Sequence, residues 1–299
     1  EEDDVRAASA RGTYGVATGV VTLEGNDEAT GQAPRVTDGD TTIDGRTVTV
    51  TLEGRRILAM EDVRSVMAPR TDGDRSSGST GTTRPSMLAD DQPVYAAAKQ
   101  LAYDGTSRLA TYTGAARLWQ GDTAIQGDEV VLDGGTGNLT ARGTVRSALM
   151  LEERDDETGK VERVPTIATS GTLVYEEKTR KATYSQNAHV SGPQGDLRAS
   201  RVELFLRESG KELDRAEAYT NVTLEDAGRT ATGTRMTYFA VEGRYLMSGD
   251  PVRIVAECRD TTGKTLTFYK ATDTIMVDGN DETRTLTKGG AKCEARRAP

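Results

Sequence analysis

The sequence predicts an all-β chain, and three features of its 299 residues support this. A phrase recurs in which Leu or Met is followed two positions later by Tyr, then by a polar turn, then by small or apolar residues at every second position. A period of two places these side chains on one face of a strand. No segment has the sustained apolar spacing of an amphipathic helix. The contents of 35% hydrophobic and 5% aromatic residues are low for a thick core, so a thin or open interior is expected.

The first part of the chain, residues 1–67, contains a strong hairpin signal. Residues 47–52 read Thr-Val-Thr-Val-Thr-Leu, an alternation of β-branched and apolar residues that is typical of a strand. The turn residues Glu-Gly-Arg-Arg at 53–56 follow, and a second alternation begins at Ile57. We expect 1–67 to form a first β unit.

Two segments interrupt the periodicity. Residues 68–93 are rich in Gly, Ser, Thr, Asp and Arg, and we expect a flexible polar loop or linker there. A loop between strands is favoured over a domain linker, because the strand phrase resumes directly afterwards. The charged insertion 152–166 is expected to extend the tip of a hairpin.

The recurring phrase is clearest in a second unit, residues 94–151. Leu-Ala-Tyr at 101–103 precedes a turn at 104–107 and a further alternating strand. The turns at 104–107 and 134–138 contain the Gly, Asn and Asp residues that positive φ angles favour. This unit therefore reads as a series of antiparallel hairpins.

The phrase returns twice in the rest of the chain. It reads Leu-Val-Tyr at 173–175 and Met-Thr-Tyr at 236–238. We expect residues 167–299 to form a third and a fourth β unit that continue the same body, since units of one pattern stack readily.

Charge and composition exclude several classes of function. The net charge of -9, with Arg interspersed among carboxylates, argues against nucleic-acid binding. No apolar run is long enough to span a bilayer. The acidic start at 1–4 is not a signal peptide, so an export signal or anchor is expected to be absent from this sequence.

Two cysteines, Cys258 and Cys293, lack the spacing of a metal site, and either a disulfide or two free thiols fits them.

Four phrases carry a resemblance to a known family. They are Ala-Thr-Tyr-Thr-Gly-Ala-Ala (110–116), Leu-Thr-Ala-Arg-Gly-Thr-Val (139–145), Ala-Tyr-Thr-Asn-Val (218–222) and Met-Ser-Gly-Asp-Pro-Val (247–252). These resemble the "A-x-G-N-V" strands of OstA-like proteins, the periplasmic lipopolysaccharide-transport family of LptA, LptC and the N-terminal domain of LptD. The resemblance covers roughly residues 5–290. Long polar insertions and the low aromatic content depart from the family pattern, which leaves open which member this is and whether 1–67 is an LptC-like module.

The resemblance implies a fold and a function. The implied fold is an elongated, open antiparallel β jelly-roll, V-shaped, with an apolar trough that holds acyl chains. The implied function is a non-catalytic periplasmic bridge, without a cofactor, that carries lipopolysaccharide or a similar acylated lipid toward the outer membrane. Its implied partners are that lipid and OstA-like proteins joined end to end by strand pairing, and a homo-oligomer is a further possibility.

The candidate lining of the trough is the apolar face of the repeated strands. Ordinary core filling of a narrow β-sandwich explains each position as well, so only the assembly of positions favours a groove. The candidate lipid-binding residues are Leu101, Tyr103, Tyr112, Ala116, Leu118, Ile125, Val130, Leu132, Leu139, Val145, Leu173, Tyr175, Tyr184, Val190, Leu197, Val202, Leu204, Val222, Met236, Tyr238 and Met247.

Other functions fit the sequence less well. The only histidine, His189, alternates away from the apolar stripe, and no catalytic triad, metal-ligand cluster or phosphate-binding Gly motif is present. A structural or adhesive β-repeat protein with a dry core is the main alternative, although its repeats are usually shorter and more regular. A carbohydrate-binding sandwich would normally expose several aromatic residues, and this chain has one Trp and three Phe.

Overall fold

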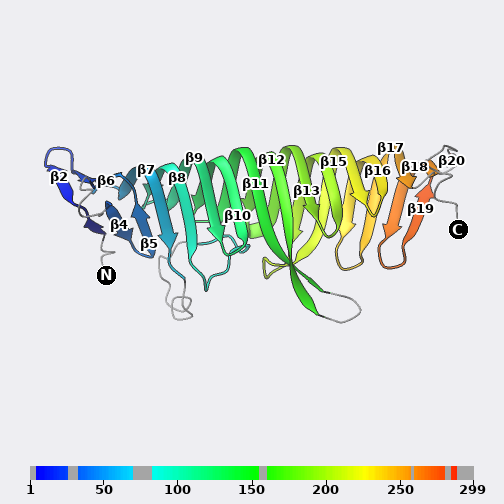
Figure 1. The fold of residues 1–299 in the computed structure, drawn as a ribbon, viewed down its shortest axis with the longest axis horizontal. Coiled ribbons are helices and arrows are strands. Elements are labelled where there is room, and N and C mark those ends of the chain that lie inside the picture. The colour runs from blue at the N-terminus through cyan, green and yellow to red at the C-terminus, as the bar shows by residue number, and fades with distance from the viewer. Residues whose placement is uncertain are drawn as a thin grey trace, which may run out of the picture. The chain divides into compact units, whose positions relative to one another are not determined.

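The structure, a computed structural model, consists almost entirely of antiparallel strands (Figure 1). The only helix in the described part of the chain is the short 3-10 helix η2 (Glu177–Thr179). The all-β prediction is therefore confirmed. The structure describes residues 5–25, 33–69, 83–154, 160–256, 259–279 and 284–287.

The chain divides into two compact units. Unit 1 comprises Glu1–Leu149 and Thr172–Arg180, and unit 2 comprises Met150–Gly171 and Lys181–Pro299. The division into four β units expected from the sequence remains a prediction.

Unit 1 contains the first ten strands. The predicted hairpin at 47–56 is confirmed, as are the turns at 104–107 and 134–138. The strands are β1 (Arg6–Ala8), β2 (Arg11–Gly15), β3 (Val20–Glu24), β4 (Arg35–Asp38), β5 (Thr41–Asp44), β6 (Thr47–Thr51), β7 (Arg56–Met67), β8 (Val94–Asp104), β9 (Leu109–Gln120) and β10 (Thr123–Asp133).

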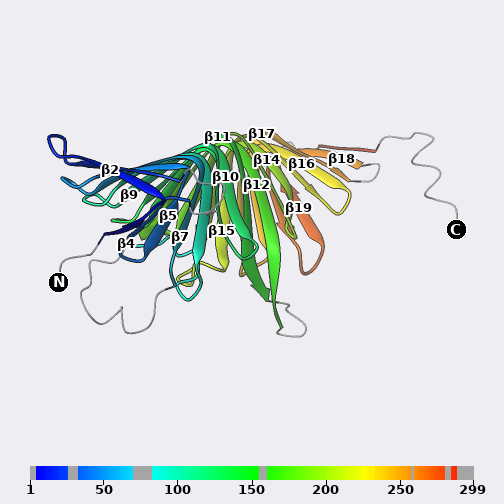
Figure 2. The ribbon, with the colours of Figure 1, turned by 60° about the vertical axis from the view of Figure 1, so that its left-hand side comes forward.

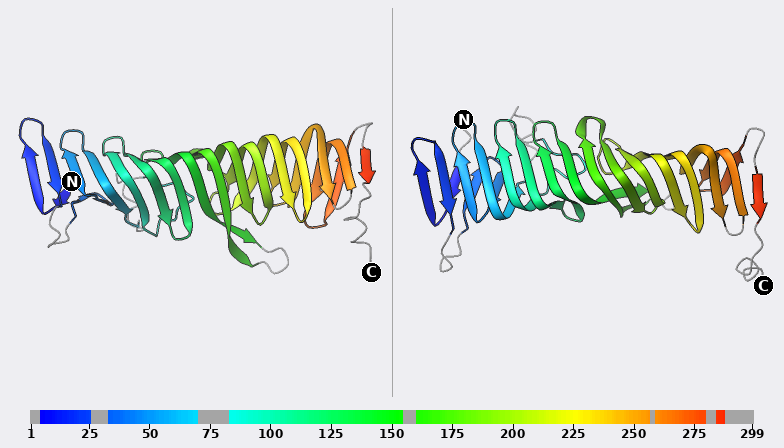
Figure 3. Two further views of the ribbon diagram at one scale, coloured as in Figure 1. Left: turned by 45° about the horizontal axis from the view of Figure 1, so that its top comes forward. Right: turned by 90° about the horizontal axis from the view of Figure 1, so that it is seen from above.

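Two long strands contribute to both units, and unit 2 contains the rest. Figure 3 shows successive strands of each unit lying side by side. The strands are β11 (Asn138–Arg154), β12 (Val161–Glu176), β13 (Lys181–Gly192), β14 (Gly195–Leu206), β15 (Leu213–Asp226), β16 (Arg229–Phe239), β17 (Arg244–Ala256), β18 (Arg259–Tyr269), β19 (Thr274–Asp278) and β20 (Arg284–Thr287).

Unit 1 has two walls that share strand β7. Residues 56–60 of β7 pair with β6, which continues through β3 to β2; we call this side the first wall. Residues 64–67 pair with β5, which continues through β4 to β1; this is the second wall. Strands β8 to β10 then run through both walls. In Figure 2, β2 on one side and β4 and β5 on the other can be followed from β7.

The walls meet at a corner, where the register between neighbouring long strands shifts near their middle. Four strands have two consecutive residues with positive φ there, Glu61–Asp62, Gly114–Ala115, Gln186–Asn187 and Thr220–Asn221. The register shifts at these pairs, so that the strand gains a residue relative to its partner. Such a bulge bends a strand. Two of these pairs lie inside the phrases at 110–116 and 218–222.

Unit 2 repeats this construction. In strand β18, residues 265–269 pair with β19 and residues 259–262 pair with β20. We call the β19 side the first wall of unit 2 and the β20 side its second wall. In the described strand pairs, the walls are joined along the corner, so the sheet is open on the opposite side. The predicted open antiparallel jelly-roll is confirmed within each unit.

In a strand with a two-residue corner, the same face of the strand lies inside both walls. In β13, Ala182 and Tyr184 precede the corner, Ala188 and Val190 follow it, and all four side chains are buried. A two-residue corner preserves the alternation of inward and outward side chains. Each unit therefore encloses a thin layer of apolar side chains between its two walls.

Candidate functional site

The candidate site is the apolar interior between the two walls of each unit. Of the 21 side chains predicted to line a trough, all but Tyr103 are buried, and Tyr103 is half-buried. Within each wall, their inward orientation follows from the period of two. Their contact with a lipid remains a prediction, because burial describes a packed core equally well.

Unit 1 contains a small internal space. Its volume is about 10 Å³, and the predicted residues Leu101, Tyr103, Tyr112 and Leu132 contribute to its lining. Burial raises the pKa of Tyr112 to about 12, although a hydrogen bond of 2.6 Å to the Ser65 hydroxyl opposes this rise. The hydroxyl is therefore neutral at physiological pH.

Unit 2 contains a larger and almost wholly apolar cavity. Its volume is about 50 Å³. A cavity of about 150 Å³ lined by aliphatic and aromatic side chains accommodates benzene, so this one holds no acyl chain while the walls stay in place. Five predicted residues line it, namely Val190, Leu197, Leu204, Met236 and Tyr238.

The mouth is the open side of each unit, opposite the corner, where turns of the two walls face each other. In unit 1 the mouth is crossed by residues 83–92, which we call the strap. The strap belongs to the segment 68–93 that was expected to be a polar loop; the other described residues of that segment are 68–69 and Pro93. On the first wall, the Thr83 N–H donates to the carbonyl of Gly134 at 2.6 Å. The hydroxyls of Ser86 and Tyr175 share a hydrogen bond of 2.8 Å, also on that side.

The strap reaches the second wall through two buried polar side chains. The Arg84 guanidinium donates to the carbonyls of Ala68 and Gln92. The amide of Gln120, at the end of β9, accepts from the Ala89 N–H at 2.6 Å and donates to the Ala89 carbonyl at 2.8 Å. The strap side chains Met87 and Leu88 are buried as well. A segment of the chain itself therefore closes the mouth of unit 1.

An ion pair also crosses the mouth of unit 1. Asp38, at the end of β4 in the second wall, pairs with Arg55, in the turn before β7 in the first wall. The Asp38 carboxylate is almost fully buried. Burial, and next the negative charge of Asp38, raise the pKa of Tyr103 to about 12.

In unit 2 the mouth is crossed by the turn between β13 and β14. Gln194 in this turn accepts hydrogen bonds from two tyrosines of the first wall: Tyr245 donates to its carbonyl at 2.5 Å, and Tyr238 to its side-chain oxygen at 2.8 Å. The Lys270 ammonium donates to the same side-chain oxygen at 2.9 Å and to the Pro193 carbonyl at 3.0 Å. Burial raises the pKa of Tyr245 above its ordinary value.

Sequence reasoning missed Arg84, Gln120, Pro193 and Gln194. Arg84 lies in the segment 68–93 that was expected to be a polar loop, and the turn at 193–194 was not singled out. The contacts they make join positions far apart in the sequence, so no local pattern could have identified them.

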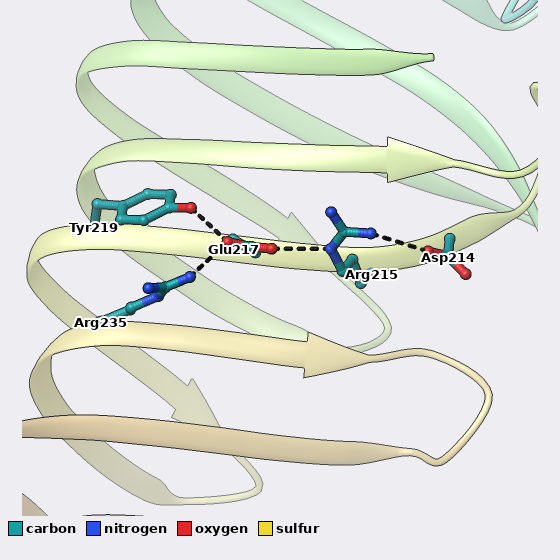
Figure 4. Close-up of polar contacts among 5 residues, drawn as sticks. All are labelled: Asp214, Arg215, Glu217, Tyr219 and Arg235. Atoms are coloured by element: carbon teal, nitrogen blue, oxygen red, sulfur yellow. Dashed lines mark hydrogen bonds and ion pairs between the residues drawn. The ribbon is translucent and has the colours of Figure 1, made fainter. Parts of the chain in front are cut away.

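The outer face of unit 2 carries a polar network around Glu217 (Figure 4). Arg215 and Arg235 donate to its carboxylate at 2.9 and 3.1 Å, and Tyr219 donates to it as well. Burial raises the pKa of Glu217, but these hydrogen bonds outweigh burial and hold it below its ordinary value. The network satisfies its own charges, and we interpret it as a stabiliser of the sheet.

Other candidate groups do not form a site. His189 lies on the outer side, with Nε2 2.7 Å from an Asp196 carboxylate oxygen. Within the described residues there is no cluster of three or more His, Cys, Asp or Glu side chains suited to a metal ion. No helix of the described part is long and apolar enough to cross a membrane. Cys258 and Cys293 lie outside the described residues, so their pairing stays open.

Comparisons with known proteins give the family. A family model described as "LptA/(LptD N-terminal domain) LPS transport protein" matches residues 35–138 and 168–274, more than half of the chain. No curated protein matches the sequence. Among solved structures, the chain is similar to LptH, the LptA homologous periplasmic component of the lipopolysaccharide transport device from Pseudomonas aeruginosa. That match has 15% identity and a TM-score of 0.36, and it covers 55% of this chain and 95% of LptH. On the family match, the chain belongs to the LptA/LptD N-terminal domain family of lipopolysaccharide transport proteins.

Proposed function

We propose that this protein binds the acyl chains of lipopolysaccharide, or of a similar acylated lipid, between the walls of its jelly-roll and passes the lipid along in the periplasm. The observation that carries the proposal is the apolar face that runs strand after strand through both units. Burying a methylene group is worth about 0.8 kcal/mol, so an acyl chain between the walls would gain several kcal/mol.

Binding requires the walls to separate at the mouth. The cavities of about 10 and 50 Å³ are too small for an acyl chain. The walls share their strand pairing at the corner, whereas turns and side chains cross the mouth. Side-chain hydrogen bonds are individually modest, so opening at the mouth is favoured over rupture of the ladder.

Two further parts of the proposal concern chemistry and partners. The protein acts without catalysis, because its interior offers apolar side chains and neutral tyrosines.

Partners of the same fold join at the sheet ends. In the described pairs, β2 pairs only with β3, and β19 only with β18. Such edges are templates for another strand.

A dry structural core is the second candidate, and the near-complete burial of the interior favours it. Tyr175 and Tyr184, for example, have no exposed surface. In that case the protein would be a structural β-repeat without a ligand.

A diazirine-bearing fatty acid separates the two candidates. The probe is mixed with the protein and irradiated, and the modified residues are mapped by peptide mass spectrometry, with and without excess lipopolysaccharide. We expect modification of inward residues such as Leu204 and Met236, and its suppression by lipopolysaccharide. Outward neighbours such as Phe205 and Thr237 are the internal controls. Modification of outward residues alone, or none, would contradict lipid binding.

A further inference from the structure

The turn that crosses the mouth of unit 2 has the composition of a hinged flap. It reads Gly192-Pro193-Gln194-Gly195, with a glycine at each end. Gly195 has φ +115°, and a Cβ there would lie 2.8 Å from the Glu225 carbonyl oxygen, so only glycine fits. Glycines at element ends can absorb large changes in φ and ψ, while proline stiffens the tip between them.

The flap covers the larger cavity directly. Gly192, Pro193, Gln194 and Gly195 all line that cavity, together with Leu197, Leu204 and Leu224 behind them. On the other side of the mouth, Tyr238 and Tyr245 line it as well. Displacing the turn would therefore open the cavity to the outside along an apolar path.

The flap is held across the mouth by hydrogen bonds to two neighbouring residues, Pro193 and Gln194, whereas the strap of unit 1 is held at residues along its whole length. Pro193 and Gln194 receive four hydrogen bonds from Tyr238, Tyr245 and the exposed Lys270. The strap adds buried apolar side chains, Met87 and Leu88, to its polar contacts. The flap residues Gly-Pro-Gln-Gly carry no large apolar side chain, so displacing the flap costs less free energy than displacing the strap.

From these contacts we infer that the flap, residues 192–195, acts as a latch: an acyl chain enters unit 2 by displacing it. Unit 1 meanwhile stays closed by its strap. This inference rests on the proposed lipid-binding function. It assigns Gln194, Tyr238, Tyr245 and Lys270 the role of positioning the latch. Loading then depends on how often the latch opens.

The test weakens the latch and measures the rate of lipid entry. The variants are Tyr238→Phe with Tyr245→Phe, which keeps both rings and removes both hydroxyls, and Lys270→Ala at an exposed position. Matched controls in unit 2 are Tyr269→Phe and Lys264→Ala, since both side chains are exposed. The probe is a pyrene-labelled fatty acid, whose initial rate of uptake is followed by stopped-flow fluorescence.

We expect the double tyrosine variant to take up the probe roughly tenfold faster than the unmodified protein, because two hydrogen bonds that hold the latch are lost. Lys270→Ala should give a smaller increase, and the controls none. In the unmodified protein, the diazirine fatty acid should label Leu204 in unit 2 well before Leu132 in unit 1.

The possible results distinguish a failure of the latch hypothesis from a failure of the proposed lipid-binding function. If the protein binds the probe but the latch variants load no faster than the controls, the latch is wrong and the proposed function stands. Equal early labelling of Leu132 and Leu204 would likewise overturn the latch. If no variant binds the probe or lipopolysaccharide, the proposed function itself fails.

Discussion

At the scale of single residues, the corner depends on backbone conformations that most side chains avoid. Gly143 in β11 has φ +94°, and a Cβ there would lie 2.0 Å from a carboxylate oxygen of Asp128 on β10. Glycine is the one residue without a penalty in this conformation. The bulge at this position therefore requires glycine for two reasons, the backbone angle and the close approach of the Asp128 side chain.

We predict that Gly143→Ala lowers the free energy of unfolding by more than the roughly 1–2 kcal/mol that a left-handed angle alone costs. Urea unfolding of the purified protein measures this. Gly39→Ala is the matched control in unit 1, since Gly39 has φ +59° and no atom within 4 Å of a Cβ. Equal losses in the two variants would mean that Asp128 moves aside without cost.

The outer network of unit 2 gives a second prediction at this scale. Glu203 and Glu217 lie directly opposite each other on β14 and β15, a repulsive arrangement. Hydrogen bonds from Arg215, Arg235 and Tyr219 to Glu217, and the ion pair of Arg201 with Glu203, offset the repulsion. The pKa of Glu217 is held below its ordinary value. Its negative charge therefore stabilises the fold at any pH above the ordinary pKa of Glu. This stabilisation is lost as the pH falls toward the lowered pKa.

Glu217→Gln should therefore reduce stability at pH 7 by about 1–3 kcal/mol, since it removes the charge from three hydrogen bonds. The difference from the unmodified protein should shrink as the pH falls from the ordinary pKa of a Glu side chain toward the lowered pKa of Glu217, where the unmodified carboxylate becomes protonated. Thermal unfolding at a series of pH values measures both effects. Glu242→Gln, which removes an exposed partner of Arg244, is the control and should change little. A pH-independent difference would show that the charge is not the cause.

At the scale of elements, the period of two predicts each strand and its inward face. Leu173 and Tyr175 in β12, and Val202 and Leu204 in β14, are buried as that period requires. The strap could not be predicted from the sequence, since it belongs to the segment 68–93, whose Gly, Ser, Thr, Asp and Arg residues indicate a solvated loop. Its order comes from partners distant in the sequence, such as Gln120 and Tyr175. The latch could not be predicted either, because its partners are also distant in the sequence.

We predict that Arg84→Ala releases the strap. The substitution leaves the carbonyls of Ala68 and Gln92 without this donor, at a cost of about 1–3 kcal/mol if they stay buried. Hydrogen exchange should become faster at residues 83–92 while the interior strands of unit 1 stay protected. The exposed residue Arg64 on β7 supplies the control, Arg64→Ala. Unchanged exchange in the strap would indicate that Gln120 and the buried Met87 and Leu88 hold it without Arg84.

At the scale of the whole molecule, both units use one construction: two walls joined at a corner, a thin apolar layer between them and a mouth crossed by polar groups. The family resemblance of the strand phrases predicted this construction, and the family match confirms the membership. What the interior holds could not be predicted from the sequence, because lipid contact and core filling demand the same residues at the same spacing.

Native mass spectrometry of the protein, purified without detergent from a host that makes lipopolysaccharide, tests the lipid-binding account most directly. The account predicts a population heavier than the bare chain by the mass of lipopolysaccharide or another acylated lipid, and recovery of that lipid by extraction. A single mass equal to that of the bare chain, with no uptake of added lipopolysaccharide, would contradict lipid binding and favour a dry structural core.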